Sequence, residues 1–157
     1  MNDKFLIWQQ PEVIAWTQIL VNSYQKLLGK ELIAPQITPQ ELSKALYNAP
    51  FVVVSHGTQT DPIFNYGNQV ALKLWSISWD KLIKTPSRLS AEPINRATRK
   101  AMLEQANSRG YIDNYQGVRI STTGKRFLIE RAIIWNLTND LGEEFGQAAT
   151  FDCWTWL

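Results

Sequence analysis

Three long segments rich in β-branched and aromatic residues, separated only by short turns, constrain the fold of this chain most strongly. They cover residues 111–121, 126–137 and 143–154. The connections at 122–125 and 138–142 contain the Gly, Asn, Asp and Thr residues that are typical of tight turns. Because such short turns join antiparallel neighbours, the C-terminal part of the chain predicts three strands of one antiparallel sheet.

The first hundred residues predict helices around two shorter strands. Apolar residues recur at three- and four-residue spacing between Pro11 and Gly29, and Thr38 and Glu41 form a capping box that opens a second helix. We expect the N-terminal helix to pack on the sheet. The expected strands are 51–55 and 62–66, and the further helices are 69–75, 78–83 and a longer one over 93–110.

Composition and charge exclude several classes of protein. The 157 residues are 45% hydrophobic and 19% charged, which excludes a disordered chain, and they suffice for one main core. A formal net charge of +2 with scattered basic residues argues against a nucleic-acid-binding protein. A single cysteine, Cys153, fits a reducing compartment, and the first 30 residues lack the apolar run of a signal peptide. We therefore expect a cytoplasmic protein without membrane or nucleic-acid partners.

Aromatic residues are unusually abundant, with 7 Trp, 5 Tyr and 6 Phe. Large flat side chains serve mainly to pack helices on sheets, and this interpretation is favoured over a pocket for a planar ligand.

Motifs from the second strand onward resemble those of a PAS domain. The segment 61–68 reads Asp-Pro-Ile-Phe-Asn-Tyr-Gly-Asn and precedes Trp75 and the segment 78–83, while Gly124 and Gly142 lie where PAS strands have turns. The resemblance implies an α+β fold with a PAS-like five-stranded antiparallel sheet, a helical cluster on one face and an N-terminal helical extension. Residues 1–48 would form the extension and residues 49–157 the PAS-like domain.

Within the PAS superfamily, the chain from Phe51 to Trp154 resembles the MEKHLA domain, which is known from small cyanobacterial proteins and from plant class III homeodomain-leucine zipper regulators. A literal Met-Glu-Lys-His-Leu-Ala string is absent, so the resemblance is to the stand-alone cyanobacterial type. The DNA-binding role of the plant proteins does not transfer, because a homeodomain and a zipper are absent. The segments that carry the resemblance are 54–58, 61–66, 86–93, 117–121 and 130–132.

Candidate cofactor contacts are few. His56 is the only histidine, which excludes a multi-histidine metal site and makes a turn hydrogen bond the favoured role over haem ligation. Resemblance to flavin-binding light sensors places Ser87 where those proteins carry a reactive cysteine, so a covalent photocycle should be absent. Arg88 could clamp a phosphate or carboxylate, or it could pair with Asp61 or Glu92. We predict no cofactor, with flavin and haem disfavoured.

Strict alternation along residues 126–135 places Glu130 and Arg131 on opposite faces of an otherwise apolar strand. Buried charges need partners, so we expect one of the two to face the pocket and the other the N-terminal helix, with Arg119 as a partner for Glu130. Ligand contact and structural pairing both remain open. The face that should carry Arg131 also comprises Phe127, Ile129, Ile133 and Trp135.

The sequence contains no phosphate-binding loop, dinucleotide fingerprint or nucleophile elbow, so we expect no enzyme. The leading hypothesis is a PAS-like sensory module with a small-molecule pocket between the sheet and residues 69–110. The alternatives are a ligand-free interaction or dimerisation module, built on the apolar stripe 13–28 with Trp154 and Trp156, and a sensor that binds flavin non-covalently. The predicted ligand-binding residues are Arg88, Ser87, Arg131, Arg119, Asn65, Tyr66, Trp135 and His56.

Overall fold

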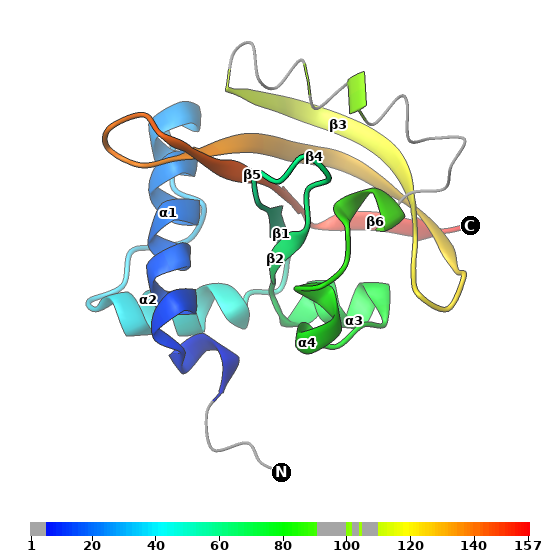
Figure 1. The fold of residues 1–157 in the computed structure, drawn as a ribbon, viewed down its shortest axis with the longest axis horizontal. Helices are drawn as coiled ribbons and strands as arrows, with labels where there is room; N and C mark the ends of the chain where they lie inside the picture. Colours follow the sequence, from blue (N-terminus) through cyan, green and yellow to red (C-terminus); the bar gives the residue numbers. More distant parts are fainter. Residues whose placement is uncertain (1–5, 91–99, 102–103, 105–109) are drawn as a thin grey trace.

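One antiparallel sheet organises the computed structural model, which describes residues 6–90, 100–101, 104 and 110–157. The strand order is β2-β1-β5-β4-β3, and β6 also pairs with β4 (Figure 1). The predicted hairpins β3–β4 and β4–β5 are confirmed. The strands are β1 (Val52–His56), β2 (Phe64–Gly67), β3 (Tyr111–Ile120), β4 (Arg126–Thr138), β5 (Glu144–Phe151) and β6 (Cys153–Trp156).

Side-chain caps fix the starts of three helices. The Thr38 hydroxyl accepts a hydrogen bond from the Glu41 amide at 3.1 Å, as the capping box predicts, and Asn68 and Ser78 cap the next two helices in the same way. The predicted helix 93–110 falls largely outside the described residues. The described helices are η1 (Ile7–Gln9), α1 (Pro11–Leu28), α2 (Pro39–Tyr47), α3 (Gln69–Trp75), α4 (Trp79–Leu82) and η2 (Ser87–Ser90).

The last predicted strand is divided into two, which gives six strands instead of five. Asp152 interrupts the chain between β5 and β6, and both strands pair antiparallel with β4. Opposite this break, Arg131 in β4 has a φ of 55°, a left-handed conformation that bulges the strand. The division is therefore a local irregularity in a hairpin that was otherwise predicted.

Each face of the sheet carries its own apolar core. In Figure 1, α1 and α2 lie on one side of β1 and β2, and α3 lies on the other. The short helix α4 contributes to both cores, with Leu82 in the first and Trp79 in the second. The first core packs α3 against Val54, Phe127 and Ile129, and the second packs α1 and α2 against Val53 and Trp135. The sheet is thus covered by helices on both faces, and its central strands are buried.

Specific contacts fix α1 on the sheet, as the sequence predicts. The Tyr24 ring meets Trp135 edge-on with centroids 5.0 Å apart, and the Trp135 Nε1–H donates to the Leu20 carbonyl at 3.3 Å. The Ser23 hydroxyl donates to the Thr138 carbonyl and accepts from the Thr138 amide, both at 3.0 Å. The apolar stripe of α1 is therefore largely buried within the chain, so these side chains do not form the exposed surface on which the alternative dimerisation hypothesis was built.

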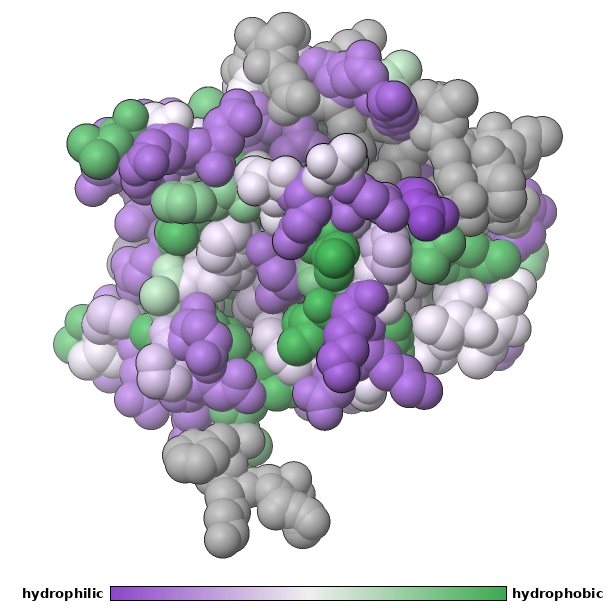
Figure 2. Space-filling model, viewed as in Figure 1, coloured by the Kyte–Doolittle hydropathy of each residue, from purple (hydrophilic) through white to green (hydrophobic). Residues whose placement is uncertain are grey.

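Polar and charged side chains cover much of the face shown in Figure 2, and apolar side chains appear there in separate small groups. None of the helices described has the length and apolar character needed to cross a membrane.

Candidate functional site

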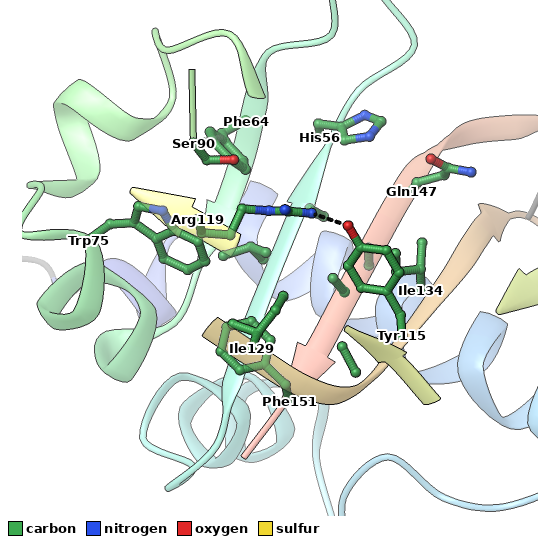
Figure 3. A pocket seen from close by; sticks show the side chains of 15 residues that line it. His56, Phe64, Trp75, Ser90, Tyr115, Arg119, Ile129, Ile134, Gln147 and Phe151 are labelled. Atoms are coloured by element: carbon green, nitrogen blue, oxygen red, sulfur yellow. Dashed lines mark hydrogen bonds between the residues drawn. The ribbon is translucent and has the colours of Figure 1, made fainter. Parts of the chain in front are cut away.

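A cavity of about 50 Å³ lies between the sheet and α3. Figure 3 shows its side chains converging from β1, β2, α3, η2 and the three long strands. Its lining is mostly apolar, but a few polar groups interrupt it, a combination typical of ligand sites. The lining residues are Val54, Ser55, His56, Phe64, Trp75, Ser90, Tyr115, Arg119, Ile129, Ala132, Ile134, Gln147, Ala148, Ala149 and Phe151.

Arg119 is the one arginine among the described residues of this lining, and it is 7% exposed. Its side chain extends across the cavity toward Tyr115 (Figure 3). One guanidinium nitrogen, Nη2, donates to the Tyr115 hydroxyl at 2.9 Å, and Nη1 donates to the Val118 carbonyl at 2.9 Å. The guanidinium also lies 5.5 Å from the Tyr115 ring centroid. Both hydrogen-bond acceptors are neutral, and no carboxylate of the described residues is within ion-pair distance of Arg119.

Gly117 makes the contact between Arg119 and Tyr115 possible. A Cβ atom at this position would lie 2.6 Å from the Tyr115 hydroxyl oxygen and 3.1 Å from Arg119 Nη1. A larger side chain here would displace the Tyr115 and Arg119 side chains, which close over the α-carbon of this glycine.

Trp75 forms the wall of the cavity on the α3 side. Its ring meets Phe127 and Phe151 edge-on, with centroids 5.3 Å and 6.2 Å away. Thr122 holds the end of α3 by donating its amide to the Trp75 carbonyl at 3.0 Å. Trp75 is 7% exposed, and its buried Nε1–H has no acceptor among the residues described.

Four further polar residues line the cavity, namely Ser55, His56, Ser90 and Gln147. His56 Nδ1 lies 2.9 Å from the Gly57 carbonyl oxygen, in the turn contact favoured by the sequence. The Gln147 amide donates to Asn136 Oδ1 at 2.8 Å across β5 and β4, and the Ser90 hydroxyl donates to the Ser87 carbonyl at 2.8 Å. These groups add hydrogen-bonding capacity to the lining.

The segment expected to contact a ligand through Ser87 and Arg88 lies beside the cavity instead of lining it. Ser87 is buried, and its amide donates to the Pro62 carbonyl at 2.8 Å. Arg88 is 49% exposed and pairs with Asp61 at 3.1 Å, so the structural alternative weighed for this arginine is the one observed. Of this segment, only Ser90 reaches the cavity.

The expected position of Arg131 is wrong. The bulge at this residue shifts the alternation of β4, so that Ala132 and Ile134 join Phe127 and Ile129 on the cavity side. Arg131 itself is exposed and lies outside the cavity. Simple alternation assumes a regular strand, and a left-handed residue violates that assumption. The expected pairing of Arg119 with Glu130 is also wrong, because Arg119 bonds Tyr115.

Asn65, Tyr66 and Trp135 belong to the opposite side of the sheet. Asn65 accepts a hydrogen bond from the Ser55 hydroxyl at 2.5 Å, and Tyr66 packs edge-on against Trp79. Both Tyr66 and Trp135 are fully buried in the second core. Burial raises the pKa of the Tyr66 phenol far above its usual range, with Tyr47 adding to the shift.

Of the eight predicted residues, the structure therefore brings Arg119 and His56 together in the cavity. Sequence reasoning did not single out Trp75, Tyr115 or Gln147 as site residues. One signal was available, because Tyr115 and Arg119 are four residues apart and a regular strand places such residues on one face.

Flavin does not fit this site. A cavity of about 50 Å³ is far smaller than the several hundred Å³ that enclose a ligand of drug size. Serine at position 87 also lacks the thiol of the covalent light sensors. Within residues 6–90 and 110–157, no three His, Cys, Asp or Glu side chains cluster as metal ligands.

Solved structures with this fold include sensory domains. The PAS domain of a protein from Colwellia psychrerythraea has a TM-score of 0.62 at 14% identity, covering 71% of this chain and 92% of that one. A light-oxygen-voltage domain studied with a flavin analogue has a TM-score of 0.59 at 17% identity, with coverages of 74% and 84%. The light-oxygen-voltage domain of the blue-light photoreceptor Aureochrome1 has a TM-score of 0.54 at 20% identity, with coverages of 78% and 86%. The chain therefore has the PAS fold.

Sequence comparison adds a family. The homeobox-leucine zipper protein ATHB-8 of Arabidopsis thaliana is 24% identical over 139 residues, which are 83% of this chain and only 16% of that relative. The MEKHLA domain family model matches residues 14–156, a span that includes most of α1 as well as the whole sheet. The chain belongs to the MEKHLA domain family.

Proposed function

We propose that this protein is a PAS-like sensory module that binds a small ligand in the cavity between the sheet and α3. The observation that carries the proposal is a cavity inside the core whose lining includes the buried donors of Arg119 and Trp75. A core built for stability alone is close-packed and leaves few polar groups unpaired. The sensory class of the similar folds supports the same function.

Catalysis is not part of the proposal. The described cavity lining contains no Asp, Glu, Lys or Cys. The hydroxyl groups of Ser55 and Ser90 donate to an amide oxygen and to a backbone carbonyl, so neither has a general base as its acceptor. The residues thus offer binding and orientation but no activated nucleophile.

Native purification followed by extraction and mass spectrometry is the first test. We expect a small molecule to co-purify with the wild-type protein and to be lost from an Ala132→Leu variant. Ala132 is fully buried and lines the cavity, so a larger side chain takes up the ligand's space. Ala15→Leu makes the same change on an exposed turn of α1 and should leave the ligand bound.

The opposite result would count against a sensory pocket. A wild-type protein that carries no ligand and whose thermal stability responds to no compound in a metabolite panel would favour the interaction module instead. An absorbance scan on the same sample tests the flavin alternative, since a bound flavin is coloured.

We further propose that the signal leaves through a protein partner or a second copy of the chain, in the cytoplasm. Trp156 and Leu157 are 50% and 62% exposed at the end of β6, which supports a contact surface there. Light scattering on the wild type and on Trp156→Ser tests this, because a monomer in both would contradict self-association.

We also propose that the chain is related more closely to the stand-alone cyanobacterial members of the family than to the plant members. The absence of a Met-Glu-Lys-His-Leu-Ala string supports this relation.

A further inference from the structure

The cavity holds a positive charge that the described part of the chain does not neutralise. Arg119 is 7% exposed, and the described residues of the cavity lining include no aspartate or glutamate. The ion pair that the described residues do form, between Arg88 and Asp61, lies on the surface. Burying a cation without a counter-charge costs free energy, so a fold that keeps one here needs a compensating interaction.

Unused hydrogen-bond donors accompany this charge. A guanidinium has five N–H donors, and the bonds to Tyr115 and Val118 engage two of them. The Trp75 Nε1–H is a further buried donor in the same lining, and it too has no acceptor within the described chain. Figure 3 shows both side chains beside the same space, with the Arg119 stem next to the Trp75 ring, the guanidinium extending toward Tyr115 and the indole nitrogen on the side of the ring away from it. The described lining therefore offers unpaired donors on Arg119 and Trp75.

We infer that the ligand of this cavity is a small carboxylate, held by the Arg119 guanidinium beside the Trp75 ring. The inference rests on the proposed ligand-binding function and names the chemistry of its ligand. A carboxylate supplies the missing negative charge, and its two oxygens match the planar fork of an arginine. The cavity volume of about 50 Å³ limits the ligand to a few non-hydrogen atoms, as in acetate or propionate.

Titration of the intact protein with acetate and propionate, followed by NMR of the indole N–H signals, tests the inference. The 7 tryptophans should give 7 such signals, and the one missing from Trp75→Phe identifies Trp75. We expect both carboxylates to shift this signal, with dissociation constants at least tenfold lower than those of acetamide and propionamide. The uncharged amides have the same shape, so the difference measures the charge.

Variants of Arg119 separate recognition from packing. Arg119→Gln should weaken propionate binding at least tenfold, and Arg119→Lys should retain part of the affinity because it keeps the charge without the fork. Arg88→Gln is the matched control, because this arginine is exposed and lies outside the cavity. Arg119→Met should raise the melting temperature of the ligand-free protein, because it removes an uncompensated buried charge.

The outcomes distinguish this inference from the proposed function. Three results would overturn the inference that the ligand is a carboxylate. They are equal affinities for carboxylates and amides, an unchanged affinity in a folded Arg119→Gln variant, and no response to either carboxylate. A neutral molecule recovered by native extraction would do so as well, while leaving the sensory pocket standing. An empty protein that responds to no compound at all would overturn both.

Discussion

The hydroxyl group of Tyr66 lies in the second core and has no hydrogen-bond partner among the described residues. Replacing Tyr66 with Phe removes a buried polar group without breaking a bond. We expect the free energy of unfolding to rise by about 1 kcal/mol, measured by urea denaturation at neutral pH. Tyr115→Phe is the control with the opposite sign, because the Tyr115 hydroxyl accepts a hydrogen bond from Arg119. A loss of stability in Tyr66→Phe would mean that this hydroxyl has a partner after all.

The same residue predicts an alkaline loss of stability. Burial, with a smaller contribution from Tyr47, raises the Tyr66 pKa above its ordinary value of 10.0, so the folded protein holds the phenol proton more tightly than the unfolded chain. Below the unfolded pKa, the phenol is protonated in both states and the free energy of unfolding does not depend on its ionisation. As the pH rises above that pKa, the unfolded chain loses the proton first, and the free energy of unfolding falls. Thermal denaturation at a series of alkaline pH values should therefore show a shallower decline for Tyr66→Phe than for the wild type. An equal decline of the two melting temperatures with pH would contradict the raised pKa of Tyr66.

At Gly146 in β5, the backbone of β1 lies so close that there is no room for a side chain. Its φ is 144°, and a Cβ atom there would collide with the His56 carbonyl oxygen. We expect Gly146→Ala to lower the free energy of unfolding by more than about 3 kcal/mol, since both strain and collision oppose it. Gly142→Ala separates the two effects, because Gly142 has a φ of 80° but open space around it, and should cost about 1 kcal/mol. Equal losses in the two variants, measured by urea denaturation, would show that the collision is relieved.

Residue positions were predictable from the sequence only where local rules held. For Arg88 two roles were open, a ligand contact or an ion pair with Asp61 or Glu92, and the structure shows the pair with Asp61, which is 27 residues away in the sequence. Arg131 could not be placed, because no propensity predicts a left-handed arginine inside a strand. Trp75 was assigned to a helix beside the pocket, but its missing acceptor is a property of the packed core and has no sequence signal.

At the scale of secondary-structure elements, Asn68 joins three segments. Its side-chain amide donates to the carbonyls of Leu46 and Phe51, and its oxygen accepts from the amides of Val53 and Ala71. All four hydrogen-bonding positions are used, and the residue is fully buried. Asn68 therefore connects the end of α2, the start of β1 and the first turn of α3.

Replacing Asn68 with Asp tests this connection. A carboxylate keeps the two acceptor contacts but loses both donors and places a charge against two carbonyl oxygens. We expect the free energy of unfolding to fall by about 3–5 kcal/mol, measured by chemical denaturation. Ser78→Ala removes only the exposed cap of α4 and should cost about 1 kcal/mol. Similar losses of unfolding free energy in both variants would show that Asn68 acts only as a helix cap.

Elements were predicted well where turns and caps mark their ends. The capping box at Thr38 and the turns at 122–125 and 138–142 located α2 and the C-terminal hairpins. The division of β5 from β6 at Asp152 was missed, because it depends on the opposing bulge at Arg131 and therefore on tertiary pairing. A single sequence also gave no reason for Asn68 to bond beyond its own helix.

At the scale of the whole molecule, the two cores share one sheet. The predicted boundary at residue 48 treats α1 and α2 as an extension, and the family match begins inside α1. Six hydrophobic side chains of residues 6–48 are buried, among them Leu20 and Leu46 at 0% exposure. At about 1.5–3 kcal/mol each, their burial contributes on the order of 10 kcal/mol, comparable to the whole stability of a typical domain.

The chain of residues 49–157 should therefore not fold on its own. Without α1 and α2, the side chains of Val53, Trp135 and Leu137 would face water, and the Trp135 Nε1–H would lose its acceptor. We expect circular dichroism of this fragment to show no cooperative thermal transition and no near-ultraviolet signal from fixed aromatic rings. Leu20→Ala in the full chain is the graded control and should cost about 3 kcal/mol while leaving a cooperative transition. A fragment that melts cooperatively would instead establish residues 49–157 as an autonomous domain, with α1 and α2 as an attachment to a sheet that is stable without them.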